Sequence, residues 1–147
     1  MIDKKDEMVL SELKKNARQS TKSIAKHINI PRVTVHDRIQ KMMDRGVIKS
    51  FEVTIDYQKI GFSSEVFIFV SFLPNPDVSQ RQLAKRIAKF PGVYEVHIIS
   101  GEYDLLLKVR GKSLEDVGKL VVDKLRQLLG VGKTVTFACF ETIKEQP

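Results

Sequence analysis

The feature that most constrains the fold is the run EVFIFVSFL at residues 65–73, which is apolar at both sets of alternating positions. A strand with one face in water would alternate polar and apolar residues, so this run predicts a strand covered on both faces or lying at an interface. Pro74-Asn75-Pro76 ends it. Residues 78–90 then place Leu83, Ile87 and Phe90 at helical spacing, which predicts a helix.

The same strand-then-helix order occurs a second time. Residues 93–99 and 105–110 are predicted strands on either side of the turn sequence 100–104. Ser113 and Asp116 form a capping-box pattern that opens a second helix. Residues 134–143 are the predicted last strand.

The order strand, helix, strand, strand, helix, strand predicts an antiparallel sheet with both helices on one face, the ferredoxin-like βαββαβ architecture. The other sheet face would expose the aromatic residues of 65–73. A second subunit is expected to cover it, so a homodimer is predicted.

The first third of the chain has the pattern of three helices. Apolar spacing predicts a helix over 4–15, and Ser20 or Thr21 offers an N-cap for a second. Asn29 suits the turn that follows, and Pro31 suits the first turn of a third helix, which Gly46 ends.

Two short extended segments, 47–49 and 51–55, are predicted to form a two-stranded wing after the third helix. Two short helices joined by a tight turn match a helix-turn-helix. We therefore expect a winged helix-turn-helix over 1–50, a strand-bearing linker over 51–63 and an α+β domain over 64–147.

Positive charge is concentrated in this first third. The chain has 25 Lys+Arg against 18 Asp+Glu, and residues 14–49 alone hold ten basic and two acidic residues. This asymmetry indicates a polyanionic partner, either nucleic acid or an anionic membrane surface. The alternatives are a solvated basic face or a three-helix domain that binds protein.

The third helix is predicted to read DNA. Arg32 and Thr34 suit base edges in the major groove, whereas Lys26, Lys41, Arg45 and Lys49 suit phosphates. The full predicted set of DNA-contacting residues is Lys26, Arg32, Thr34, His36, Arg38, Gln40, Lys41, Arg45 and Lys49.

Other classes of site have little support. Gly130 to Thr134 resembles the end of a phosphate-binding loop, but position 127 is Gln and the context is helix, loop, strand. The predicted third strand, LLLKVR, lacks the aromatic residues of an RNA-stacking sheet. His27, His36 and His97 lie on separate elements, so no metal is expected.

The single cysteine, Cys139, excludes an internal disulfide framework and is expected to be a small buried side chain. No catalytic cluster is recognisable, so the protein is not expected to be an enzyme or to carry a cofactor. The longest uncharged stretch, 66–76, is too short to cross a membrane, and no apolar run follows the first residue. A cytoplasmic protein is expected.

The chain as a whole resembles the Lrp/AsnC feast/famine family of transcription regulators. The matching pieces, in order, are Asn16-Ala17-Arg18, SIAKHINIPRVTVHDRIQKMMDRGVIKSF, SGEYDLLLKVR and TVTFACFETIKE. The resemblance implies a winged helix-turn-helix joined to a domain of the RAM/ACT-like type. It also implies homodimers that assemble to octamers, as tetramers of dimers. Pro31 and His36 differ from residues common in relatives, so no operator sequence is transferred.

The resemblance further implies that an amino-acid effector binds at subunit interfaces. The matching positions are Ser100, Gly101, Glu102, Tyr103, Asp104, Thr134 and Thr136. Gly101 would let backbone approach a ligand, and Glu102 or Asp104 would accept from an ammonium group. Alternatively, Gly101 only turns a hairpin and Asp104 caps it. Two other functions remain open: a small-molecule sensor whose N-terminal helices bind protein rather than DNA, and an enzyme built on the ferredoxin-like half.

Overall fold

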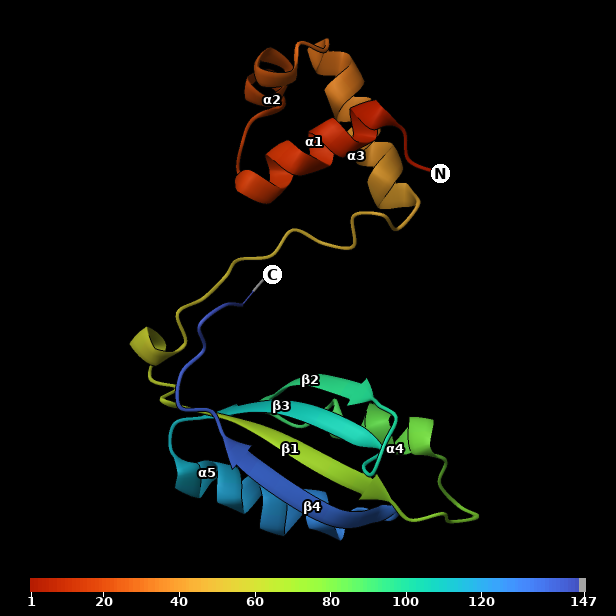
Figure 1. Cartoon of the computed structure of the whole chain (residues 1–147), viewed down its shortest axis with the longest axis vertical. Coiled ribbons are helices and arrows are strands. Elements are labelled where there is room, and N and C mark those ends of the chain that lie inside the picture. Colours follow the sequence, from red (N-terminus) through yellow and green to blue (C-terminus); the bar gives the residue numbers. More distant parts are fainter. Residues whose placement is uncertain (146–147) are drawn as a thin grey trace. The chain divides into compact units, whose positions relative to one another are not determined.

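The computed structural model describes residues 1–145 and divides the chain into two compact units, Met1–Thr54 and a second unit from Ile55 onward (Figure 1). The division falls inside the segment 51–63 that the sequence predicts as a linker. Each unit has its own apolar core.

The first unit is a bundle of three helices: α1 (Lys4–Lys15), α2 (Thr21–Ile28) and α3 (Arg32–Asp44). Each helix start has a local cause. Asp3 and Asp6 form a capping box on α1, and the Ser20 hydroxyl accepts from the amide of Ser23 at the start of α2. Asn29 ends α2 in the left-handed conformation, with φ of 53°.

The bundle core comes from apolar residues at helical spacing on all three helices. Val9 and Leu13 of α1 pack with Ile24 of α2 and with Val35 and Met42 of α3. Because these positions point inward, the remaining positions of α3 form an outer face.

The predicted wing strands are not present in the described part of the chain. Residues 46–48 form a turn closed by the amides of Val47 and Ile48 donating to the carbonyl of Met42. Residues 51–55 are exposed and pair with no strand. The alternation of Phe51, Val53 and Ile55 satisfies the pattern of a strand but supplies no partner, and a strand requires one.

The second unit is built on a four-stranded antiparallel sheet with the order β2-β3-β1-β4. Its elements are η1 (Gln58–Ile60), β1 (Ser64–Phe72), α4 (Gln80–Ile87), β2 (Val93–Ile98), β3 (Leu105–Gly111), α5 (Leu114–Lys119), a π turn (Leu120–Lys124), η3 (Leu125–Gln127) and β4 (Val131–Ala138). This is the predicted ferredoxin-like order, and the fold class is confirmed.

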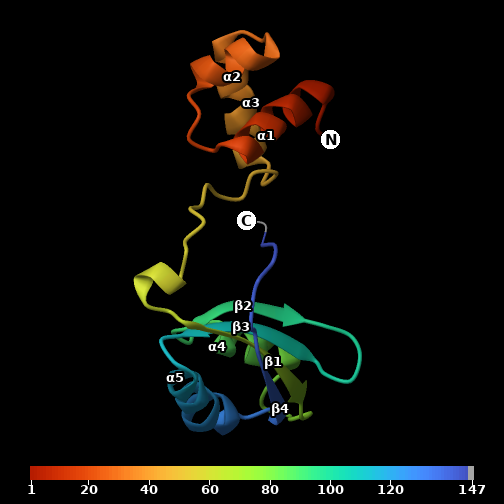
Figure 2. The same ribbon diagram turned by 60° about the vertical axis from the view of Figure 1, so that its left-hand side comes forward.

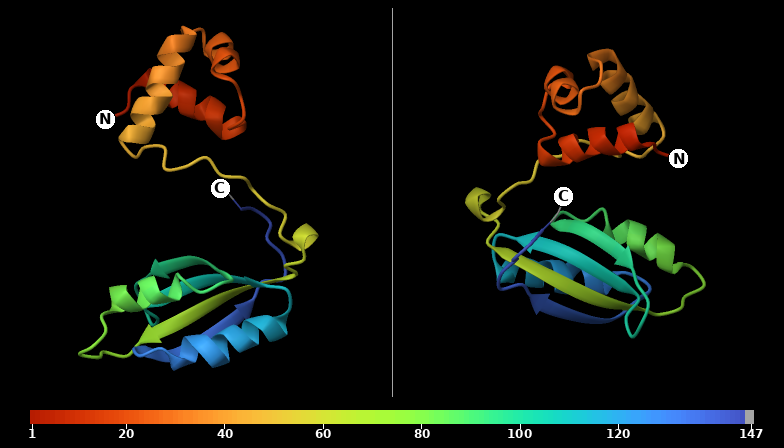
Figure 3. Two further views of the ribbon diagram at one scale, coloured as in Figure 1. Left: turned by 180° about the vertical axis from the view of Figure 1, so that it is seen from behind. Right: turned by 45° about the horizontal axis from the view of Figure 1, so that its top comes forward.

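Both helices cover one face of the sheet, as Figures 2 and 3 show. Val66, Ile68 and Val70 of β1 point to the helices and are fully buried, whereas Phe67 and Phe69 point to the open face and are half-buried. The run 65–73 therefore has one apolar side that the helices cover and a second apolar side that they leave open.

The last strand differs from the prediction. β4 begins at Val131, three residues before the predicted start, and ends at Ala138. Gly130, with φ of 93°, makes the turn alone, and Val131 already pairs with Phe72. Beyond Ala138 the tail leaves the sheet, and Phe140 and Ile143 are exposed.

Among residues 1–145, no helix combines the length and apolarity that spanning a bilayer requires.

Candidate nucleic-acid interface and effector loop

The outer face of α3 presents most of the residues predicted to contact DNA. Arg32, His36, Gln40 and Lys41 are exposed on it, and Thr34 is half-buried. The predicted phosphate-contacting residues Lys26, Arg45 and Lys49 are also exposed. These cations are accessible to a polyanion without any rearrangement of the bundle.

Arg38 is the exception, and its prediction as a DNA contact is corrected. Position 38 lies three residues after buried Val35 and four before buried Met42, on the side of α3 that meets α1. Its guanidinium is 2.8 Å from a carboxylate oxygen of Asp3 and 2.7 Å from one of Asp6. With only 22% of its side chain exposed, Arg38 joins two helices.

This contact sets the electrostatics of the first turn of α1. The pKa of Asp3 lies below its usual value, because its carboxylate accepts from the amide of Asp6 and from Arg38. The pKa of Asp6 is also lowered, first by the amide of Asp3 and then by Arg38, against the opposing effect of burial. Both carboxylates are therefore held in the charged form.

A second link, between α1 and α2, was not predicted. The buried carboxylate of Glu12 lies 2.9 Å from Nδ1 of His27 and also pairs with Lys15. These hydrogen bonds lower the pKa of Glu12, that from Lys15 most. In the sequence, the only indication that this carboxylate faces inward is the helical spacing of Glu12 with Val9 and Leu13.

The side chain of Arg32 is held at the first turn of α3. Its Nε donates to the hydroxyl of Thr21, at 3.1 Å, and within residues 1–145 the terminal nitrogens of the guanidinium have no protein partner. Gln40, by contrast, uses one of its two amide hydrogens to donate to Asp44 at 3.0 Å.

The loop 100–104 joins β2 to β3. Gly101 has φ of 116°, which favours glycine, and a Cβ added to it would meet no atom within 4 Å. Ser100, Gly101 and Glu102 are exposed. The loop thus offers accessible backbone groups and one free carboxylate.

Asp104 has a structural task in this loop. Its Oδ2 accepts from the amide of Phe72 at 2.7 Å, and its carbonyl accepts from Ile99 and from Nε2 of Gln80. Asp104 therefore caps the loop, as the alternative interpretation expected. Of the two acidic residues in the loop, Glu102 is the one whose carboxylate is exposed to solvent.

Tyr103 and the two threonines lie on opposite faces of the sheet. Tyr103 packs on Phe69 of the open face, with ring centroids 5.4 Å apart. Thr134 and Thr136 pair with Val70 and Ile68, whose side chains are buried under the helices, so the threonines share that face. The Thr134 hydroxyl accepts from Arg126.

The end of the loop and Thr134 nevertheless lie at the same position along the strand direction of the sheet. Val70 of β1 pairs with Leu105 on one side and with Thr134 on the other. The end of the loop and Thr134 are therefore separated by the width of β1.

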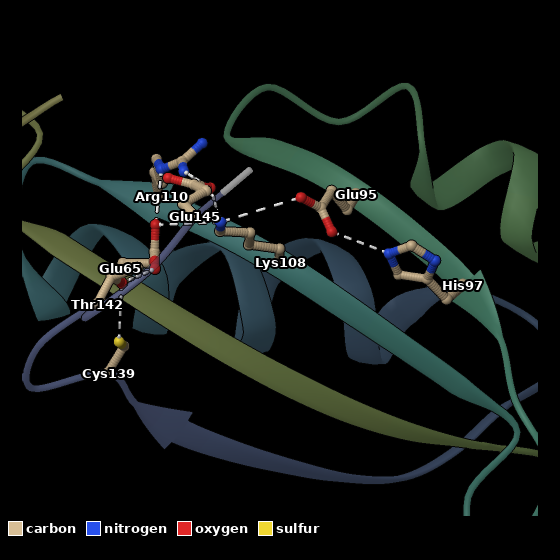
Figure 4. Close-up of polar contacts among 8 residues, drawn as sticks. All are labelled: Glu65, Glu95, His97, Lys108, Arg110, Cys139, Thr142 and Glu145. Carbon is tan, nitrogen blue, oxygen red and sulfur yellow. Dashed lines mark hydrogen bonds and ion pairs between the residues drawn. The ribbon is translucent and has the colours of Figure 1, made fainter. Parts of the chain in front are cut away.

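A polar cluster at the other end of the open face was missed by the sequence analysis (Figure 4). Lys108 and Arg110 of β3 are more than nine-tenths buried, and both pair with Glu145 of the tail. Glu65 accepts from Nε of Arg110 at 2.8 Å and from the Thr142 hydroxyl at 3.1 Å. Alternation along β3 places both cations on the sheet face without helices.

Cys139 is a free, half-buried thiol whose Sγ lies 3.5 Å from the Thr142 hydroxyl. Within residues 1–145, no three His, Cys, Asp or Glu side chains converge in a way that would hold a metal ion. His97 pairs with Glu95, at 2.9 Å.

Comparison with known families covers nearly the whole chain. Residues 2–49 match the family model described as winged helix-turn-helix DNA-binding, and residues 65–147 match the Lrp/AsnC ligand binding domain. An uncharacterised HTH-type transcriptional regulator of Pyrococcus furiosus is 46% identical over 99% of this chain and 97% of its own length. The HTH-type transcriptional regulator LysM of Sulfurisphaera tokodaii is 38% identical over 90% of this chain and 91% of its own length.

Solved structures share the fold at low sequence identity. A Neisseria meningitidis transcriptional regulator in complex with L-Met has a TM-score of 0.92 at 21% identity, covering 99% of this chain and 94% of that one. Escherichia coli AsnC has a TM-score of 0.89 at 21% identity, covering 100% and 97%. The predicted family and function are confirmed, and the protein-binding alternative is not favoured. The chain belongs to the Lrp/AsnC family and is a DNA-binding transcriptional regulator with a ligand-binding domain.

Proposed function

We propose that the protein binds double-stranded DNA as a homodimer through the outer face of α3 and that a small effector, of the amino-acid class, modulates this binding. The observation that carries the proposal is the exposed face of Arg32, His36, Gln40 and Lys41 on a helix whose opposite side is locked to α1 and α2. A rigid helix with a basic outer face suits the major groove.

Arg32 and Thr34 are the proposed base-reading residues. Arg32 stands at the first turn of α3, where a recognition helix meets base edges, and its free terminal nitrogens suit the paired acceptors of guanine. Lys26, Lys41, Arg45 and Lys49 would neutralise phosphates and hold the unit in register.

The open face of the sheet supports the dimer. Phe69 and Phe137 form an edge-to-face pair on it, with centroids 5.5 Å apart, and 53% of Phe137 is exposed. A patch of this kind is the usual signature of an interface. A two-fold dimer would present two α3 helices to half-sites separated by whole turns of DNA. Assembly of dimers into an octamer would extend the bound DNA.

The loop 100–104 is the proposed effector contact, with Glu102 and the amides around Gly101 as the groups that recognise an amino acid. Tyr103 would line the site on the open face, whereas Thr134 and Thr136 of the same chain lie on the other face of the sheet and would not contact an effector there. The neisserial regulator of similar fold is a complex with L-Met, which makes L-Met the first compound to try. An effector acts only through different affinity for two states of the assembly.

We propose that the protein acts by binding and not by catalysis, that it carries no cofactor and that it works in the cytoplasm. The test is binding of the full chain to genomic DNA fragments with and without the twenty amino acids. Site-specific binding that one amino acid shifts supports the whole proposal. Specific binding that no amino acid changes would refute the proposed effector. If the protein binds no fragment even at low salt, the proposed DNA-binding function is wrong.

A further inference from the structure

Tyr57 is the first residue after the three-helix unit whose side chain packs against the sheet. Residues 49–56 are exposed without exception, whereas Ile48 before them and Tyr57 after them are half-buried. Ile48 packs against the core of the three-helix unit. The eight residues between these two are the connecting segment, or tether, and they include the boundary between the two units.

The side chain of Tyr57 packs against one buried cation and two aromatic rings, those of Tyr94 and Phe62. The guanidinium carbon of Arg110 lies 4.0 Å from the centre of the Tyr57 ring and 4.7 Å from that of Tyr94. The two tyrosine rings also meet edge to face, with centroids 5.0 Å apart. Cation–π contacts of this kind strengthen when the cation is removed from water, as Arg110 is at 7% exposure.

Arg110 is itself fixed from three directions. Its Nε donates to Glu65 at 2.8 Å, its Nη2 donates to Glu145 of the tail at 3.0 Å, and β3 holds its backbone (Figure 4). An arginine held in this way offers Tyr57 a flat and immobile surface.

We infer that Tyr57, held on Arg110, sets the length of free chain between the DNA-binding unit and the sheet and thereby selects the spacing of the half-sites that a dimer accepts. The inference rests on the proposed DNA-binding dimer. Tyr57 and Arg110 would act as positioning residues, because they hold the connecting segment on the sheet unit and lie outside the proposed DNA-binding face.

The length of chain involved decides the size of the effect. The next half-buried side chain is Phe62, which lines a surface hollow together with Pro91, Val109 and Leu120. Release of Tyr57, together with unwinding of the short helix η1 that its carbonyl closes, would extend the tether from residues 49–56 to residues 49–61. Five more residues add at most about 17 Å of reach. Two tethers in a dimer add about 34 Å, which is about one helical turn of DNA.

The same change lowers the effective concentration of the second DNA-binding unit at its half-site. Effective concentration falls roughly as the −3/2 power of tether length, so thirteen residues in place of eight give about a twofold loss at the preferred spacing. Sites one turn further apart gain, because the longer tethers reach them.

The experiment compares Tyr57→Ala with Tyr57→Phe in the full chain. A half-site is first selected from a random DNA library with the unmodified protein. Affinities are then measured for DNA that carries two copies of it at spacings increased by one base pair at a time over two helical turns. A third variant, with five Gly/Ser residues inserted after Ser50, lengthens the tether and leaves Tyr57 in place.

The expected result is that Tyr57→Ala and the insertion lose about twofold at the preferred spacing and bind sites one turn longer almost as well. Tyr57→Phe, which keeps the ring, keeps the original preference. Tyr57 lies outside the buried core, so unfolding temperatures close to that of the unmodified protein are expected, and a single half-site is bound equally by all.

If the insertion alters the spacing preference and Tyr57→Ala does not, the proposed role of Tyr57 is wrong. A preference that both variants leave unchanged would show that the segment 49–56 is held by other contacts in the dimer, which also overturns it. If the unmodified protein selects no DNA, or shows no spacing preference, the proposed dimer on two half-sites has failed first, and the inference fails with it.

Discussion

At the scale of single residues, the structure divides the basic side chains of α3 into those that face outward and one that joins helices. Arg32 and Arg38 are both arginines six positions apart in a helix, yet one is free at its terminal nitrogens and the other is paired with Asp3 and Asp6. Sequence spacing identifies the outer face but not this pairing, because the acids lie more than thirty residues away in the chain.

Arg32→Ala is expected to lower base discrimination at one operator position by about 1–3 kcal/mol, because a bidentate contact to a base is lost. Lys49→Ala is the matched control and should weaken binding to all sequences alike. The measurement is competition between operator and single-base variants. Unchanged discrimination in Arg32→Ala would assign base reading to other residues.

Arg38→Met is expected to lower the unfolding temperature of the full chain at pH 7, and the difference should shrink on acidification. The pKa values of Asp3 and Asp6 are lowered in the folded state, so their stabilisation is present above the unfolded values and is lost as pH falls through the folded ones. Helical circular dichroism during heating at pH 7 and pH 3 measures this. An equal difference at both pH values would mean that the ion pairs contribute little.

At the scale of elements, local signals predicted what depends on local interactions. Capping residues and apolar spacing place α1 at 4–15, as observed, because a helix satisfies its hydrogen bonds within itself. The wing and β4 were misplaced, because a strand is defined by its partner. Residues 51–55 alternate like a strand but have no partner strand. Val131 has flanking glycines, yet it belongs to a strand because it pairs with Phe72.

The candidate effector loop shows the same limit. The sequence indicates a tight turn at Gly101, and the φ of 116° confirms it. The use of Asp104 to hold the amide of Phe72 depends on the neighbouring strand and was left open.

Gly101→Val is expected to abolish the response to an effector while DNA binding remains measurable. A β-branched residue at this φ strains the backbone by about 1–3 kcal/mol, so the loop must change shape. Ser100→Ala is the control for a change that keeps the backbone. The assay is DNA affinity with and without the effector, and an unaltered response would move the effector site elsewhere.

At the scale of the whole molecule, the second unit presents a sheet with helices on one face and aromatic side chains on the other. Phe67, Phe69 and Phe137 are only partly covered within the chain. The sequence pattern of 65–73 anticipated this face, although it did not show the buried cations Lys108 and Arg110 at its end.

Phe137→Glu is expected to shift the protein from dimer toward monomer, because a carboxylate would be buried at the interface without a partner. Thr136→Glu, on the neighbouring position of β4 but the other face, should leave the dimer intact. Sedimentation at several concentrations measures the equilibrium. A stable Phe137→Glu dimer would place the interface on another surface.

The central claim, that the basic face of the first unit binds DNA phosphates, is tested most directly by the salt dependence of operator affinity. Four phosphate contacts per unit, from Lys26, Lys41, Arg45 and Lys49, predict a slope of about −7 for a dimer in a plot of log affinity against log salt. A slope near zero would contradict the claim.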